Sequence, residues 1–340
     1  MKRTGQLWKE ICTYDNALDA YFKARKGKRY KHEVLNFEKD REQNLLKIVD
    51  ELTALKYKPG GYKTFRVYEP KERLIMALPF KDRVVQHMIC NYIEPVYEKR
   101  FYEHSYACRR EKGVHAASKT IQRWIYNLEV VEGKKIYALK CDIHHYFQSV
   151  NHARLKEENR RYLKDPELLR VLDQIIDHNG TFPEGVGIPV GNLTSQLFAN
   201  VYLNVLDQYI KNELHCRYYI RYMDDFVILS EDINELRAIL KQIEAFLNRE
   251  LKLSLNPKTT IVAAKNGIDF VGFKHYSQTK KVRKIAMRRM RRLLLKYEKG
   301  RISREQFIIS FESRTANMEH ADTYHLVRRY VEEAEALLAA

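Results

Sequence analysis

Two β-rich segments that end on acidic residues constrain the fold of this chain more than any other feature. KKIYALKCDI, at 134–143, is typical of a strand that ends on Asp142. CRYYIRYMDDFVILS, at 216–230, has apolar β-type runs on either side of Asp224 and Asp225, which predicts a hairpin with acids at its tip. Successive strand side chains point to opposite faces, so neighbouring acids can share a site only at a turn. One antiparallel sheet would therefore bring three carboxylates together.

Three carboxylates in one place suit magnesium chemistry. Oxygen ligands favour Mg²⁺, and phosphoryl transfer to a primer hydroxyl uses two ions about 3.5–4 Å apart. We therefore predict two Mg²⁺ ions at Asp142, Asp224 and Asp225, with Mn²⁺ able to replace them. Asp224 is expected to ligate directly and Asp225 to support it. An isolated Asp-Asp pair is usually only a turn or a helix cap, so the flanking β-type runs carry this interpretation.

The charge balance points to a polyanionic partner. Lys and Arg number 61 against 44 Asp and Glu, which gives a formal net charge of +17 and a pI near 9.5. Such a balance favours nucleic acid over an anionic membrane surface. The first residues carry charges where a secretory signal needs an apolar run, and no stretch approaches a membrane span. We expect a cytoplasmic protein with no membrane partner.

Apolar periodicity predicts an α/β chain that is long enough for two or three packed subdomains. Residues 57–80 are basic, rich in β-branched and aromatic residues, and broken by Pro59-Gly60-Gly61 and Pro70, which predicts a hairpin. Helical periods occur at 1–55, 81–100, 114–126, 152–178, 192–214, 234–251 and 302–336. The five cysteines are scattered without a CxxC pair, so neither a zinc site nor a disulfide framework is expected.

The YMDDF segment is similar to the catalytic tyrosine-x-Asp-Asp hairpin of reverse transcriptases. Further segments resemble motifs of the prokaryotic enzymes in the same order along the chain. They are KERLIMALPFKDRVVQHMICNYIEPVYEKRF (71–101), LKCDIHHYFQSVNH (139–152), IPVGNLTSQLFANVYLNVLD (188–207), LNPKTTIV (255–262) and FVGF (270–273). The resemblance implies an RNA-directed DNA polymerase that uses deoxynucleoside triphosphates.

This family resemblance also implies a right-hand polymerase fold with fingers, a palm sheet backed by helices, and a small thumb. The expected domains are N-terminal helices and fingers at 1–137, a palm at 138–279 and a basic helical thumb at 280–340. An insertion between fingers and palm is expected at about 160–195.

Residues 190–196 point to one lineage within the family. Val190-Gly191-Asn192-Leu193-Thr194-Ser195-Gln196 fits the apolar-Gly-x-x-x-Ser-Gln motif of reverse transcriptases from diversity-generating retroelements. Retroviral and group II intron enzymes have Gln before this Gly and Pro after the Ser, and the Val-Thr-Gly triplet of retron enzymes is absent. From the sequence up to residue 340 we also expect none of the maturase or endonuclease extensions that many intron-encoded enzymes carry. The alternatives are a retron, group II intron or phage-defence enzyme, or a non-catalytic nucleic-acid-binding scaffold.

The resemblance assigns nucleotide contacts to several residues. Arg73, together with Lys63 or Arg66, would neutralise the triphosphate, although exposed cations are usually only solvated. Phe147 is the residue expected to exclude a nucleotide that carries a 2′-hydroxyl, and Tyr146 is the alternative. Either residue could instead be an ordinary aromatic residue of the core. The remaining assignments are a metal-facing carbonyl at Ile143, nucleotide contacts at Val190, Gly191 and Gln196, and a pyrophosphate proton donor at Lys258.

Nucleic-acid contacts are expected at the hairpin, the FVGF segment and the basic helix after 280. The residues are Tyr222, Met223, Gly272, Lys284, Arg288, Arg291 and Arg292. The helix resembles a thumb element that tracks an RNA–DNA duplex, and a solvated basic face is the alternative.

The lineage carries its own expectations. It implies a template-repeat RNA, a basic accessory variability protein built as a barrel-shaped oligomer, and a prokaryotic host or a phage genome. Val190 cannot hydrogen-bond as a glutamine amide would, so we expect error-prone copying. The lineage places the errors chiefly opposite template adenines, which diversifies a target gene.

Overall fold

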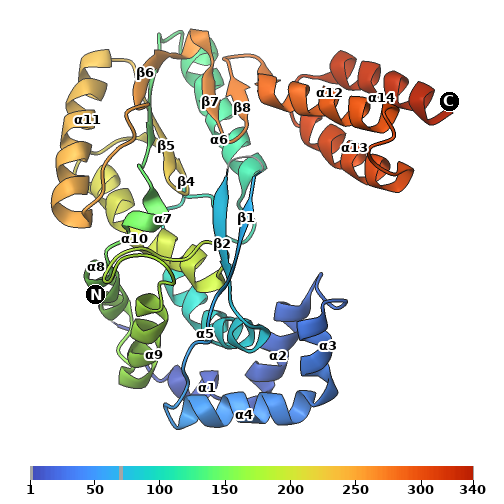
Figure 1. Cartoon of the computed structure of the whole chain (residues 1–340). Helices are drawn as coiled ribbons and strands as arrows, with labels where there is room; N and C mark the ends of the chain where they lie inside the picture. Colours follow the sequence, from blue (N-terminus) through green and yellow to red (C-terminus); the bar gives the residue numbers. More distant parts are fainter. Residues whose placement is uncertain (1–2, 69–71, 340) are drawn as a thin grey trace. The chain divides into compact units, whose positions relative to one another are not determined.

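A computed structural model describes residues 3–68 and 72–339 (Figure 1). Its contacts divide the chain into two compact units. The first unit contains Met1–Cys108, Ile143–His215 and Lys241–Asn256, and the second contains Arg109–Asp142, Cys216–Leu240 and Pro257–Ala340. The boundaries of these two units differ from those expected for fingers, palm and thumb, and that division stays a prediction. In the described part of the chain, no helix combines the length and apolar character needed to cross a membrane.

The first unit begins with the predicted helical layer, which is confirmed. Its helices are α1 (Trp8–Ile11), α2 (Tyr14–Arg25), α3 (His32–Lys39) and α4 (Arg41–Thr53). Val34, Leu45 and Ile48 follow the helical period and are almost completely buried. α2 packs along α5 (Phe80–Glu98), the long helix predicted at 81–100.

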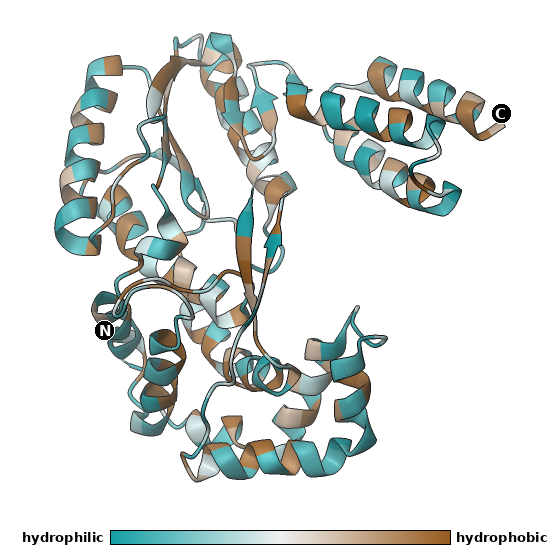
Figure 2. Cartoon of the chain, in the orientation of Figure 1, coloured by the Kyte–Doolittle hydropathy of each residue, from teal (hydrophilic) through white to brown (hydrophobic). Residues whose placement is uncertain are grey.

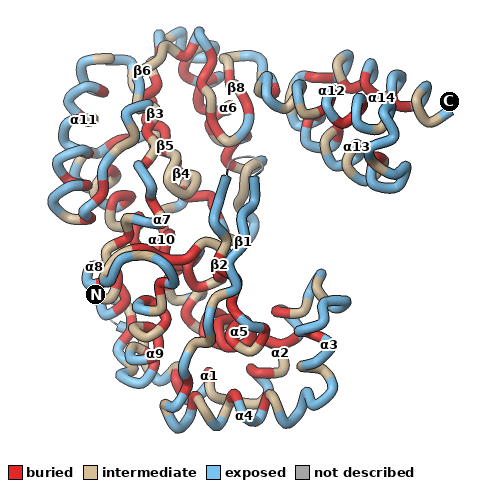
Figure 3. Tube along the Cα trace, in the orientation of Figure 1, coloured by how far each residue is buried: buried red, intermediate tan, exposed pale blue. Residues whose placement is uncertain are grey.

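The predicted basic hairpin is also present in the first unit. β1 (Lys63–Val67) pairs antiparallel with β2 (Arg73–Ala77), and Pro70 lies outside the described residues. All five residues of β1 are exposed, whereas Met76 near the end of β2 is buried. Figure 3 shows this contrast between the pale hairpin and the red core of the neighbouring helices.

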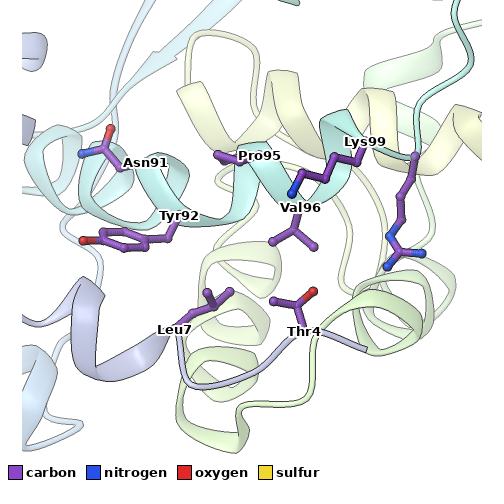
Figure 4. A pocket seen from close by; sticks show the side chains of 8 residues that line it. Thr4, Leu7, Asn91, Tyr92, Pro95, Val96 and Lys99 are labelled. Carbon is purple, nitrogen blue, oxygen red and sulfur yellow. The ribbon is translucent and has the colours of Figure 1, made fainter. Parts of the chain in front are cut away.

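Four further helices and one π-helical turn complete the described part of the first unit. They are α7 (Tyr146–Ser149), α8 (His152–Tyr162), α9 (Pro166–Asp177), α10 (Leu193–Asn212) and the π-helical turn η2 (Leu247–Leu251). α10 packs on both α5 and α8, and α8 packs on α9. The N-terminal segment lies beside α5 and borders a pocket with Leu7, Val96 and Lys99 in its lining (Figure 4). This pocket contains none of the predicted site residues.

The second unit contains the predicted antiparallel sheet, with strand order β4-β5-β3-β6. The strands are β3 (Tyr137–Asp142), β4 (Tyr218–Tyr222), β5 (Asp225–Ser230) and β6 (Thr260–Ala263). α6 (Val114–Tyr126), which continues into η1 (Asn127–Val131), packs on β4, where Trp124 meets Tyr218 edge to face. α11 (Ile233–Phe246) follows β5, begins in this unit and belongs to the first unit from Lys241 onward. Together with η2 it occupies the predicted helix at 234–251.

A small sheet and three helices complete the second unit. They are β7 (Ile268–Phe270), β8 (Phe273–His275), β9 (Lys280–Val282), α12 (Lys284–Glu298), α13 (Arg304–Met318) and α14 (Tyr324–Ala339), with the short η3 turn (Ala264–Asn266) before β7. Met290, Leu293 and Leu294 of α12 form an apolar core with α13 and α14. The basic helix expected after 280 begins only at Lys284, because residues 280–282 pair with β8 as a strand.

Candidate active site

The acidic tips of the two predicted β segments lie side by side. Asp142, the last residue of β3, is directly opposite Asp225, the first residue of β5. Directly opposed residues of an antiparallel pair project to the same face of a sheet, with Cβ atoms about 4.5–5.5 Å apart. Asp224 lies in the turn between β4 and β5, next to Met223, whose φ of 56° is left-handed. The fold therefore gathers three acids from distant parts of the sequence.

The surroundings of Asp225 disfavour its ionised form. Burial raises the pKa of this carboxyl to about 7, Asp142 and Asp224 add to the rise, and Lys140 and Arg283 oppose it. The Oδ1 atom of Asp225 is buried and has no hydrogen-bond partner within the structure. A buried carboxylate beside two further acids is stabilised most directly by a cation.

The three acids offer the carboxylate oxygens that divalent cations prefer as ligands. One of these oxygens, Oδ1 of Asp225, is buried without a hydrogen-bond partner in the structure. Within the described residues, however, no three His, Cys, Asp or Glu side chains are arranged as a ready metal-binding group. Assignment of the ions to these acids is therefore a proposal.

Two basic residues near the acids were not predicted from the sequence. Arg221 of β4 is completely buried, and its guanidinium donates to the main-chain carbonyl of Met223 at 3.0 Å. Lys140 lies two residues before Asp142 on β3, so its side chain projects to the same face. The sequence did contain a signal for both residues, because each is a cation inside an otherwise apolar β-type run: Arg221 in YYIRY and Lys140 in YALKC.

The residues expected to contact the triphosphate lie on the β1–β2 hairpin. Lys63 is opposite Ala77, and Arg73 is opposite Val67, so the two cations share a face but lie about 13 Å apart along it at ~3.3 Å per residue. Both side chains are exposed. The hairpin therefore does not bring Lys63 and Arg73 together.

The loop expected to contact the nucleotide reaches the same hairpin. The main-chain N–H of Met76 donates to the carbonyl of Val190 at 3.1 Å. Gly191 has a φ of 116°, and a Cβ at this position would lie 3.0 Å from Ile75 Cγ2. Only glycine meets both demands without strain. Gln196 is exposed at the end of the first turn of α10.

Tyr146 and Phe147, the two contenders for the sugar gate, occupy different environments. Tyr146 is 2% exposed, and its hydroxyl donates to the carbonyl of Ala199 at 2.6 Å. Phe147 is half-buried and follows it on α7. The core position of Tyr146 favours Phe147 as the residue available to a substrate. Ile143 is buried directly after β3.

Residues 58–275 match the model of the family described as "Reverse transcriptase (RNA-dependent DNA polymerase)". The chain belongs to the reverse transcriptase family. Members of this family are RNA-directed DNA polymerases, and the matched residues include the β1–β2 hairpin and all three acids.

Known relatives and one solved structure agree with this family. The chain is 29% identical over 269 residues to protein YkfC of Escherichia coli K12, a match that covers 66% of this chain and 68% of YkfC. It is 21% identical over 294 residues to the group II intron-encoded protein LtrA of Lactococcus lactis, covering 65% of this chain and 47% of LtrA. Telomerase from Candida albicans, solved with a fragment of telomeric RNA, superposes with a TM-score of 0.51 at 14% identity, covering 83% and 55% of the two chains. This likeness confirms the predicted reverse transcriptase fold.

The remaining predicted residues of this reverse transcriptase lie in the second unit. Lys258 is exposed in a turn before β6, and Tyr222 is opposite Asp225. Gly272 has a φ of 92° and open space where a side chain would project. Lys284, Arg288, Arg291 and Arg292 are all exposed on α12, opposite its apolar stripe (Figure 2). Their roles stay predictions.

Proposed function

We propose that Asp142, Asp224 and Asp225 of this reverse transcriptase hold two Mg²⁺ ions for addition of deoxynucleotides to a primer on an RNA template. The direct pairing of Asp142 with Asp225 carries the proposal, because it places carboxylates from two strands on one face. Bound Mg²⁺ would activate the primer hydroxyl and stabilise the charge on the triphosphate. Asp142 and Asp224 would supply the direct ligands, and Mn²⁺ would substitute for Mg²⁺.

The chain's other residues would position the substrates. Arg73 would neutralise the triphosphate, Phe147 would exclude a 2′-hydroxyl, and Lys258 would protonate the leaving pyrophosphate. On α12, cations with a spacing of three or four residues would contact the phosphates of the RNA–DNA duplex without reading its sequence. In this proposal residues 1–137 form the N-terminal helices and fingers, 138–279 the palm and 280–340 the thumb.

Primer extension on an RNA template tests the proposal. Wild-type protein with Mg²⁺ should incorporate deoxynucleotides, and Asp224→Ala should lose at least roughly a thousandfold of this activity, since charge-stabilising groups supply several kcal/mol to such barriers. Asp50→Asn, at an exposed position of α4, is the matched control and should extend normally. If wild-type protein binds the primer–template but does not extend it with either Mg²⁺ or Mn²⁺, the chain is a nucleic-acid-binding scaffold and the proposal is wrong.

We further propose that the enzyme belongs to a diversity-generating retroelement of a prokaryote or phage and works in the cytoplasm. The Val190–Gln196 motif supports this lineage, whereas relatives such as LtrA fit a group II intron enzyme equally well. The template would be a template-repeat RNA, and the partner a basic accessory protein that forms an oligomeric barrel. cDNA synthesis that requires the cognate repeat RNA would support this assignment. Equal synthesis on unrelated templates, with no effect of an accessory protein, would favour the other lineages.

A further inference from the structure

The root of the β1–β2 hairpin is held by a residue 116 positions away in the sequence. Tyr62, directly before β1, stacks on the ring of His178 with centroids 4.6 Å apart and planes at 21°. The Tyr62 hydroxyl donates to the main-chain carbonyl of His178 at 2.7 Å. In return, Nε2 of His178 lies 2.9 Å from the carbonyl of Gly60, and it must carry the proton because a carbonyl only accepts. Three contacts thus join the same two segments.

The segment from His178 to Gly191 also contacts β2, the second strand of the hairpin. Val190 accepts the hydrogen bond from the Met76 N–H, as described above. A Cβ at Gly180 would lie 2.4 Å from Met76 Sδ, and one at Gly191 would press on Ile75. Residues without side chains therefore let this segment approach β2 closely. The hairpin is held on one strand at Tyr62 and on the other at Met76.

Asn192 extends this link to the start of α10. Its Nδ2 donates to the Tyr62 hydroxyl at 3.3 Å, and the Asn192 side chain is 4% exposed. The next residue, Leu193, donates its N–H to the buried Gln86 Oε1 of α5 at 3.1 Å. By contrast, β1 beyond this root is exposed along its whole length. The contacts that orient the hairpin are therefore concentrated at its root.

We propose that Tyr62 and His178 are positioning residues for the incoming deoxynucleoside triphosphate. They would hold the hairpin that carries Arg73 in one orientation relative to the Val190–Gly191 loop, so that both meet the nucleotide together. This inference rests on the proposed polymerase function. A hairpin held in advance loses less conformational freedom when substrate binds, and the benefit appears as substrate affinity.

Steady-state primer extension separates this role from a general structural one. Tyr62→Phe and His178→Phe both keep an aromatic ring and remove hydrogen bonds. Each should raise KM for the deoxynucleotide roughly three- to tenfold, the loss expected for one or two hydrogen bonds, and leave kcat within about twofold. The double variant should show less than the product of the two effects, because both changes break one link.

A rescue variant and an exchange measurement complete the test. His178→Gln retains an N–H donor for the Gly60 carbonyl and should recover part of the lost affinity, unlike His178→Ala. Amide hydrogen exchange of residues 63–68 and 72–77 should become faster in both phenylalanine variants. Tyr30→Phe is the matched control, because Tyr30 is 77% exposed in the same unit. Active wild-type protein with variants of unchanged KM would overturn the positioning role alone, and wild-type protein without extension would overturn it together with the polymerase proposal.

Discussion

At the scale of single residues, the acids are placed where they harm stability. Asp142 and Asp225 are opposed across two strands, and like charges in this position repel. Burial raises the pKa of Asp225 to about 7, so its ionised form is disfavoured in the folded chain. Such an arrangement has no structural advantage and is typical of a functional site. Basic residues close to these acids, such as Arg221, are therefore expected to support the same site.

Arg221→Gln should impair the turn that carries Asp224. The buried guanidinium donates to the Met223 carbonyl in a partly buried hydrogen bond, and loss of such a charged donor costs about 1–3 kcal/mol. We expect a lower melting temperature and a larger fall in kcat than in primer–template affinity, because the turn holds an acid and not the duplex. Arg217→Gln, at an exposed position directly before β4, is the control. An unchanged kcat would show that the turn does not depend on Arg221.

Val190→Gln should make copying more accurate. The substitution offers an amide where the native side chain cannot hydrogen-bond, which should favour correct base-pair geometry. Sequencing of cDNA should show fewer errors, chiefly opposite template adenines, with an improvement of several-fold for one added hydrogen bond. Val130→Gln, at an exposed position of the second unit, is the control. The same error rate in wild type and Val190→Gln would remove the infidelity hypothesis.

At the scale of elements, α12 separates its two faces cleanly. Met290, Leu293 and Leu294 are buried in the three-helix core, and Lys284, Arg288, Arg291 and Arg292 are exposed. A helix with this pattern gains stability from its apolar face and leaves its cations for a polyanion. Substitution of the exposed cations should therefore alter binding without unfolding the element.

Arg288→Gln combined with Arg291→Gln should weaken RNA–DNA duplex binding and its dependence on salt. Each lost phosphate contact should reduce the slope of log affinity against log salt by about 0.7–0.9. Fluorescence anisotropy at several salt concentrations measures this slope. Arg328→Gln combined with Arg329→Gln removes the same charge from α14, where both arginines pair with glutamates one turn away, and should change the slope less. Equal slopes for both double variants would show that α12 is not the duplex-binding element.

At the scale of the whole molecule, acid should destabilise the second unit through a buried histidine. His275 is completely buried, and burial lowers its pKa to about 4, with Lys280 lowering it and Asp269 opposing it. The unfolded chain binds this proton at an ordinary pKa near 6.5, so stability is lost as the pH falls from about 6.5 towards 4. The effect comes from the fold and not from the proposed chemistry.

His275→Gln should reduce the acid sensitivity. Thermal unfolding followed by circular dichroism should show a fall in stability between pH 7 and pH 4 that is smaller than in wild type by on the order of 2 kcal/mol. His325→Gln, at an exposed histidine, is the control and should follow wild type. Identical pH profiles for all three proteins would show that His275 does not titrate in this range.

The sequence by itself determined the β-rich segments, most helices and the reverse transcriptase family. Alternating and helical apolar periods are local, and the motif order is a property of the chain, so neither needs a tertiary structure. Only the tertiary structure decided that Asp142 faces Asp225, that Arg221 is buried beneath the turn, and that Lys63 and Arg73 are apart. It also decided that His178 holds Tyr62. Strand register and long-range hydrogen bonds depend on which distant segments pack together, and that choice is made by the whole core and not by local pattern.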